Sequence, residues 1–193
     1  EHARFSRYEN SFLWLKNAGV AIPTLNIQEP TFSFKLNELR NLFKLFQNDV
    51  GLLTSQYASG IQLQLLQGDV KQNYGAIYEN LVAQELYCHG FGGDEHELHY
   101  FNNKKQGELD FVIAQHSKVI PIEVKSGKDY ERHNALTNVL ANDDYNIDFA
   151  YVLTNDNLRV EGKRIYMPMY MLMFIQKSPA PANQIFKFDL HNL

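Results

Sequence analysis

The stretch GELDFVIAQHSKVIPIEVKSG, which begins at Gly107, constrains the fold more than any other part of the chain. Two runs rich in β-branched and aromatic residues, 108–113 and 119–125, flank a short polar segment, and this pattern predicts a β-hairpin. If the tight turn centres on His116 and Ser117, the residue numbers of every cross-strand pair sum to 233. The predicted register therefore states which side chains oppose one another.

This register places Asp110 opposite Glu123 and Glu108 opposite Lys125. Opposed residues have Cβ atoms roughly 5 Å apart, and Glu123 and Lys125 share a face because they are two residues apart on one strand. Three carboxylates and one ammonium should thus gather on the hairpin. The alternative is an exposed hairpin with solvated charges, in which Glu108 and Lys125 form a surface ion pair.

Like charges directly opposite each other destabilise a strand pair, so Asp110 and Glu123 would repel unless a cation lies between them. Mg²⁺ takes a few carboxylate oxygens and keeps several waters, and Mn²⁺ is an alternative. A neighbouring lysine such as Lys125 can orient a water or stabilise negative charge that develops on a phosphate. The sequence predicts a metal site held by Asp110 and Glu123, with Lys125 as a catalytic partner.

A third carboxylate is expected from the segment Gly75–His89, which has the apolar periodicity of a largely buried helix that ends at Gly90. The neighbours of Glu79 at the third, fourth and seventh positions along this helix are apolar. A glutamate there is costly unless it is paired or bound to a cation. We therefore assign Glu79 to the metal and catalytic site. The alternative is a buried glutamate bonded to a tyrosine or to backbone.

A protein that coats nucleic acid through its overall charge is usually basic, whereas this chain has a net charge of −4 and a pI near 6.0. Any contact with nucleic acid must be local. Lys104, Lys105 and Lys128 flank the hairpin and are candidates for contact with a phosphate backbone. The alternative for each is an ordinary solvated lysine.

The 193 residues suit one large domain, or a domain with a small appendage. The single cysteine, Cys88, excludes an intramolecular disulfide and suits a reducing compartment, and its place on the predicted buried helix suggests a core residue. No apolar run approaches the ~20 residues that span a membrane, and no signal peptide is visible. We expect a cytoplasmic protein without a membrane partner. The chain opens at Glu1 in mid-pattern, so we expect a fragment of a longer protein.

The chain divides into a helical or winged-helix-like segment, 1–48, and a larger α/β domain, 49–193. In the first segment, 5–17 reads as an amphipathic helix, 20–27 as a strand, and 36–46 as either a helix or a second strand. In the second, 75–153 reads as α–β–β–β–α–β, which predicts a mixed sheet flanked by helices. A short strand at 164–167 and a C-terminal helix at 168–175 complete the prediction.

The pattern Asp110…Glu123-x-Lys125 on a hairpin resembles the core of the PD-(D/E)XK nuclease superfamily. Several blocks together resemble the C-terminal domain of unknown function of a large family of prokaryotic AAA-type ATPases: FKLFQNDVGLL, GAIYENLVAQEL, LHYFNNKKQGELDFVI, IPIEVKSG, AYVLTND and RIYMPMYML. Those proteins carry a P-loop ATPase module first, then a winged-helix-like segment, then a PD-(D/E)XK-like domain. The family's acidic helix position corresponds to Glu79, and its remaining polar positions correspond to the three hairpin residues.

This resemblance implies a restriction-endonuclease-like fold and a covalently linked N-terminal ATPase module. No GxxxxGK[ST] occurs in the chain, so ATP is expected only in that module. The expected function is Mg²⁺-dependent hydrolysis of nucleic-acid phosphodiesters, with DNA as the expected nucleic acid. The alternative is a non-catalytic module that docks nucleic acid or a protein for the ATPase.

Overall fold

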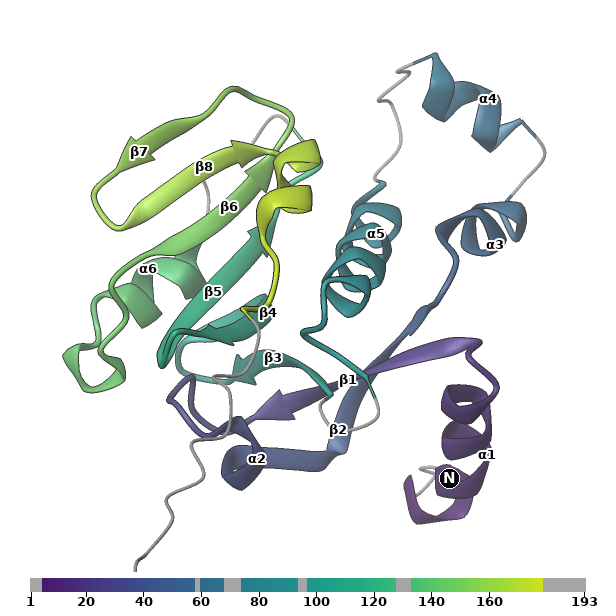
Figure 1. Ribbon diagram of the computed structural model, residues 1–193, viewed down its shortest axis with the longest axis horizontal. Helices are drawn as coiled ribbons and strands as arrows, with labels where there is room; N and C mark the ends of the chain where they lie inside the picture. The colour runs from purple at the N-terminus through teal and green to yellow at the C-terminus, as the bar shows by residue number, and fades with distance from the viewer. Residues whose placement is uncertain (1–4, 58–59, 68–73, 94–96, 128–132, 179–193) are drawn as a thin grey trace, which may run out of the picture.

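The computed structural model describes residues 5–57, 60–67, 74–93, 97–127 and 133–178. Within them the chain forms a mixed eight-stranded sheet of order β2-β1-β3-β4-β5-β6-β8-β7, with helices against it (Figure 1). The strands are β1 (Ala21–Ile27), β2 (Glu38–Gln47), β3 (Leu98–Asn103), β4 (Gly107–Gln115), β5 (Lys118–Val124), β6 (Ala150–Thr154), β7 (Arg159–Glu161) and β8 (Arg164–Pro168). The helices are α1 (Phe5–Asn17), α2 (Phe34–Asn37), α3 (Val50–Ser55), α4 (Ile61–Leu66), α5 (Gly75–Cys88), α6 (Asn134–Leu140) and the 3₁₀ helices η1 (Asp143–Tyr145) and η2 (Met169–Phe174). The predicted α/β class with a mixed sheet is confirmed.

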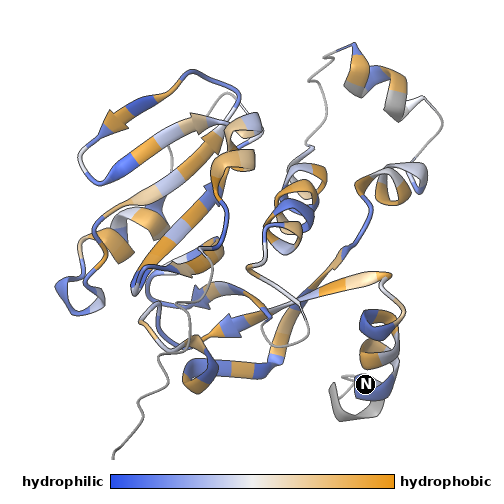
Figure 2. Cartoon of the chain, viewed as in Figure 1, coloured by the Kyte–Doolittle hydropathy of each residue, from blue (hydrophilic) through white to orange (hydrophobic). Residues whose placement is uncertain are grey.

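Two apolar layers hold the sheet, one on each face. On one face, α5 and η2 pack against the central strands through residues such as Leu86 and Leu172, and on the other face α6 does so through Leu136 and Val139. Every residue of β5 after Lys118 is buried, as expected for a strand covered on both faces. Figure 2 shows the hydrophobic residues gathering on the central strands and on α5.

The β4–β5 hairpin has the predicted register. Its five backbone pairs run from Phe111 with Ile122 to Gln115 with Lys118, and the residue numbers of each pair sum to 233. The turn residues His116 and Ser117 both have positive φ, 51° and 60°. Positive φ at both central residues defines the two-residue turn whose twist matches that of the strands it joins.

A β-bulge interrupts the other edge of β4, where it pairs with β3. His99 pairs with Val112 and Phe101 with Leu109, so one residue of β3 opposes two residues of β4, one of which is Asp110. Bulges bend a strand and re-aim a side chain next to functional sites. The bulge follows from pairing with β3, and the hairpin sequence alone does not predict it.

The N-terminal segment joins the same sheet. β1 pairs antiparallel with β2 and parallel with β3, so the sheet continues across the boundary predicted between residues 48 and 49. The ambiguous segment 36–46 lies mainly in strand β2, because pairing with β1 overrides its local helical periodicity. Helix α1 has the predicted bounds and lies beside β1 (Figure 1).

Two expectations need correction, and one strand has no counterpart in the prediction. The C-terminal helix predicted at 168–175 is a 3₁₀ helix, η2, and strand β7 was not predicted. Cys88 is exposed at the end of α5 and does not belong to the core.

Candidate functional site

Asp110 lies at the bulge, where the backbone pairing of β4 with β5 gives way to a side-chain contact. Its Oδ2 accepts a hydrogen bond of 2.7 Å from the backbone N–H of Val124. Burial raises the pKa of Asp110, while the Val124 hydrogen bond and the charges of Lys44 and Lys125 oppose the rise. Asp110 therefore lies against the end of β5, and its charge is only partly compensated.

Glu123 is the most buried carboxylate of the site, with 5% of its surface exposed. Its Oε1 lies 2.8 Å from the Nζ of Lys125, and its Oε2 is buried without a hydrogen-bond partner among the described residues. Burial raises the pKa of Glu123 to about 7, and the negative charge of Asp110 adds to the rise, while Lys125 opposes it. A buried carboxylate oxygen without a donor is costly, so Glu123 is poised to take a proton or a cation.

The structure thus brings Asp110, Glu123 and Lys125 together at the bulged end of the hairpin. The backbone pairs of the hairpin end at Phe111 and Ile122, and beyond them the Val124 N–H donates to the Asp110 side chain. Lys125 also donates its backbone N–H to the carbonyl of Leu153 on β6, at 2.8 Å. This bond anchors the lysine between two strands.

A second lysine, Lys44 on β2, was missed by the sequence analysis. Its Nζ lies 2.5 Å from Glu108 Oε1, 3.7 Å from Glu79 Oε2 and 5.0 Å from the centroid of the Tyr100 ring. Burial lowers the pKa of Lys44, but the hydrogen bond and charge of Glu108, together with Glu79 and Asp110, raise it above its ordinary value overall. Lys44 is therefore a charged counter-ion inside the acidic cluster.

Glu79 comes from α5 and has 30% of its side chain exposed. Burial and the charge of Asp110 raise its pKa, and Lys44 opposes them. Over the described part of the chain, no three His, Cys, Asp or Glu side chains are grouped so that they could hold a metal ion. The structure therefore does not gather Glu79 with Asp110 and Glu123 into the expected three-carboxylate group, and Glu79 pairs with Lys44.

Two of the predicted nucleic-acid lysines, Lys104 and Lys105, take no part in these contacts. Lys104 and Lys105 are exposed in the turn between β3 and β4, and the side chain of Asn103 caps the backbone N–H of Lys105. Lys128 lies outside the described residues. Their proposed role remains a prediction.

Comparison with known proteins identifies one matching family. Residues 74–172 match the family described as "Domain of unknown function (DUF4143)". The matched range runs from α5 to η2 and includes Glu79, Asp110, Glu123 and Lys125, whereas Lys44 on β2 precedes it. No curated protein and no solved structure matches the chain.

Within the ranges that the structure describes, no helix has the length and apolarity needed to cross a bilayer. The family match covers just over half of the 193 residues. The chain belongs to the DUF4143 family, a domain of unknown function.

Proposed function

We propose that this domain hydrolyses phosphodiester bonds of nucleic acid with the help of Mg²⁺ or Mn²⁺, in the manner of a PD-(D/E)XK nuclease. The observation that carries the proposal is the buried Oε2 of Glu123, which has no hydrogen-bond partner among the described residues and lies beside a second carboxylate and a lysine. A structural ion pair would need only one carboxylate for Lys125. The second carboxylate, Asp110, leaves an excess of negative charge that suits a divalent cation.

The two carboxylates fit Mg²⁺ better than a metal that needs a complete protein cage. Mg²⁺ usually keeps several waters and binds through one or two carboxylates plus substrate phosphates. Asp110 and Glu123 would hold the ion, and Glu79 would support them through the electrostatic field that it shares with Lys44. When bound, the metal would activate a water and neutralise charge on the phosphate.

Lys125 would act directly on the reacting groups. Its side chain is 26% exposed and its ammonium pairs with Glu123, so the protein orients a lysine that is not fully enclosed. It would orient the attacking water or stabilise the negative charge that grows on the scissile phosphate. Either action is stronger in the transition state than in the bound substrate, so Lys125 should affect turnover more than binding.

The order of elements supports the same fold assignment. Helix α5 precedes the antiparallel strands β3, β4 and β5, and helix α6 then leads to β6, which lies parallel to β5. This is the order of the restriction-endonuclease-like core. A covalently linked AAA-type ATPase module would deliver the substrate, with ATP bound in that module alone.

The test is cleavage of plasmid DNA and of single-stranded DNA and RNA with Mg²⁺ or Mn²⁺. Lys125→Ala should lower the rate on the order of 10²-fold or more, by comparison with other lost electrostatic stabilisers. Lys125→Arg should not restore the rate, because guanidinium is planar and bulkier.

Lys118→Ala is the matched control. Lys118 lies on the same strand and pairs with a carboxylate, Asp148, but 57% of its side chain is exposed at the far end of the hairpin. Its loss should leave the rate within about twofold. A wild-type protein that never cleaves with either metal, even joined to its ATPase module, would contradict the nuclease proposal. A Lys125→Ala variant that only weakens binding and reduces the salt slope by about one would favour the docking module instead.

A further inference from the structure

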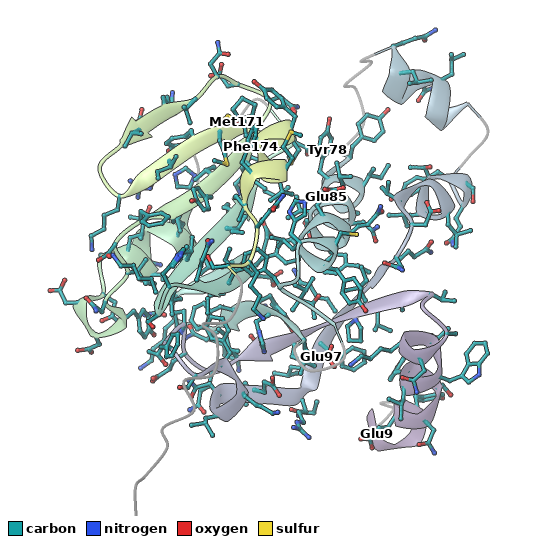
Figure 3. The ribbon with its side chains drawn as sticks, in the orientation of Figure 1. Glu9, Tyr78, Glu85, Glu97, Met171 and Phe174 are labelled. Atoms are coloured by element: carbon teal, nitrogen blue, oxygen red, sulfur yellow. The ribbon has the colours of Figure 1, made fainter. Side chains whose placement is uncertain are left out.

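A cavity of about 530 Å³ lies between α5 and η2. One face of α5 contributes Tyr78, Leu81 and Glu85, and η2 contributes an apolar wall that includes Met169 and Tyr170. Figure 3 shows Tyr78 and Glu85 on the side of α5 that faces η2. The cavity is thus built from two elements that pack on the same face of the sheet.

The floor of the cavity is tied to the strand end that carries Lys125. Thr154 and Asn155, at the end of β6, line the cavity. The side chain of Asn155 donates a hydrogen bond of 3.3 Å to the carbonyl of Ser126, which directly follows Lys125. Because Leu153, which precedes Thr154, pairs with Val124, the cavity wall adjoins the end of β5 that Lys125 directly follows.

The position of the cavity also follows a general rule of α/β sheets. β5, β6 and β8 run parallel, and the cavity opens at the ends of β6 and β8. After β5 the chain passes to α6 on one face, and after β8 it passes to η2 on the other. Ligands of such sheets bind outside the carboxyl ends of the strands, where the connections change face.

The lining suits a flat ring with hydrogen-bonding groups on its edge. Tyr170 has 71% of its surface exposed, and Tyr78 stands on the opposite wall, so both rings can stack on a ligand. An aromatic ring with this exposure stabilises a free protein little, but base–aromatic stacking in single-strand binders is a large and sequence-tolerant contribution. Glu85 and Asn155 add an acceptor and an amide for the donors and acceptors of a base edge.

We infer that this cavity receives an unpaired nucleobase next to the scissile phosphate, so that the substrate is single-stranded or contains unpaired nucleotides. The inference rests on the proposed function, because it takes the phosphate to lie at Asp110, Glu123 and Lys125. A base inside a duplex is stacked and paired, and must be extruded before it can enter such a pocket. A single strand presents its bases without that cost.

The experiment compares two exposed aromatic residues of η2. Tyr170 and Phe174 are both 71% exposed, but only Tyr170 is among the residues that line the cavity. Affinities are measured in EDTA for a fluorescein-labelled single-stranded oligonucleotide and for the blunt duplex of the same sequence. Tyr170→Ala should weaken single-strand binding on the order of tenfold, Tyr170→Phe should restore it, and Phe174→Ala should change it less than twofold.

A second readout follows the base itself. An oligonucleotide that carries 2-aminopurine should lose fluorescence on binding the wild-type protein, because the fluorescent base stacks on a tyrosine, and should keep it with Tyr170→Ala. Equal losses of affinity for Tyr170→Ala and Phe174→Ala, tighter binding of the duplex, or unchanged 2-aminopurine fluorescence would each overturn the inference. Metal-dependent cleavage by the same samples separates the two proposals. Tyr170-dependent binding without cleavage would support the base pocket and refute the nuclease proposal. Cleavage together with binding that does not depend on Tyr170 would support the nuclease proposal and refute the base pocket.

Discussion

Replacing Glu123 by glutamine should change how the stability of the metal-free protein depends on pH. The ordinary pKa of a glutamate is 4.5, and burial next to Asp110 raises that of Glu123 to about 7. The folded protein therefore keeps a proton that the unfolded chain releases between these two values. Because the folded state binds more protons there, the free energy of unfolding falls as the pH rises from about 4.5 to about 7, and this contribution is constant above that range.

The size of the effect follows from the shift. One pKa unit corresponds to about 1.4 kcal/mol, so the ionisation of Glu123 should cost the folded wild-type protein about 3 kcal/mol once complete. Glutamine has a similar shape and keeps an acceptor for the Lys125 ammonium, but it cannot ionise. The stability of Glu123→Gln relative to wild type should therefore rise by about 2–3 kcal/mol between pH 5 and pH 8.

Urea unfolding in EDTA at pH 5, 6, 7 and 8 measures this difference directly. Glu161→Gln is the matched control, because Glu161 has 54% of its side chain exposed and pairs with Arg159 at the surface. Its difference from wild type should stay within about 0.5 kcal/mol at every pH. Parallel curves for wild type and Glu123→Gln would refute the reasoning, because they would mean that Glu123 is ionised in the folded protein without cost.

Substitutions at Asp110 and at Lys44 test the rest of the charged cluster, again by urea unfolding in EDTA at pH 8. Asp110→Asn keeps an acceptor for the Val124 N–H and removes a repelling charge, so the protein should be as stable as wild type or about 0.2–1 kcal/mol more stable. Asp110→Ala removes the acceptor and should lower the free energy of unfolding by about 1–3 kcal/mol. A large loss of stability with Asp110→Asn would mark Asp110 as a structural ion-pair partner. Lys44→Met leaves Glu79 and Glu108 without their shared cation and should lower the free energy of unfolding by about 1–2 kcal/mol, between the values for exposed and buried pairs. Adding Glu79→Gln should recover part of this loss. If the effects of the two substitutions simply add, Lys44 does not act as a cation shared by the two glutamates.

The hairpin could be predicted from the sequence because its information is local. Side chains alternate with a period of two, and a two-residue turn fixes the register of both strands. A turn at His116 and Ser117 predicts the approach of Asp110 to Glu123. The contact between Asp110 and the backbone of Val124 did not follow, because it depends on the bulge that β3 imposes on β4.

Lys44 could not be predicted because its role depends on distant pairing. It precedes Glu79 by 35 residues (79 − 44) and lies in a segment whose local pattern fits a helix as well as a strand. Lys44 lies close to Tyr100 and Glu108 because β2 pairs with β1 and β1 pairs with β3. The alternation in FKLFQ was the available signal, since in a strand it sets Lys44 apart from its apolar neighbours.

The pairing of Glu79 depends on tertiary structure in the same way. Its apolar helix neighbours predict a partly buried carboxylate that needs a partner, and a metal ion is the partner expected from the sequence. In the structure the partner is Lys44. A sequence pattern can show that a buried charge needs compensation, but the source of the compensation depends on tertiary structure.

The most direct test of this account is a crystal of the domain soaked in Mn²⁺ and measured at the manganese absorption edge. An anomalous peak is expected within bonding distance of Asp110 and of Glu123 Oε2, with Lys125 adjacent and Glu79 still paired with Lys44. The peak should be absent from Glu123→Gln crystals soaked in the same way. A crystal with no manganese at these two carboxylates, or with the ion bound elsewhere in the domain, would contradict the claim that Asp110 and Glu123 form a metal site.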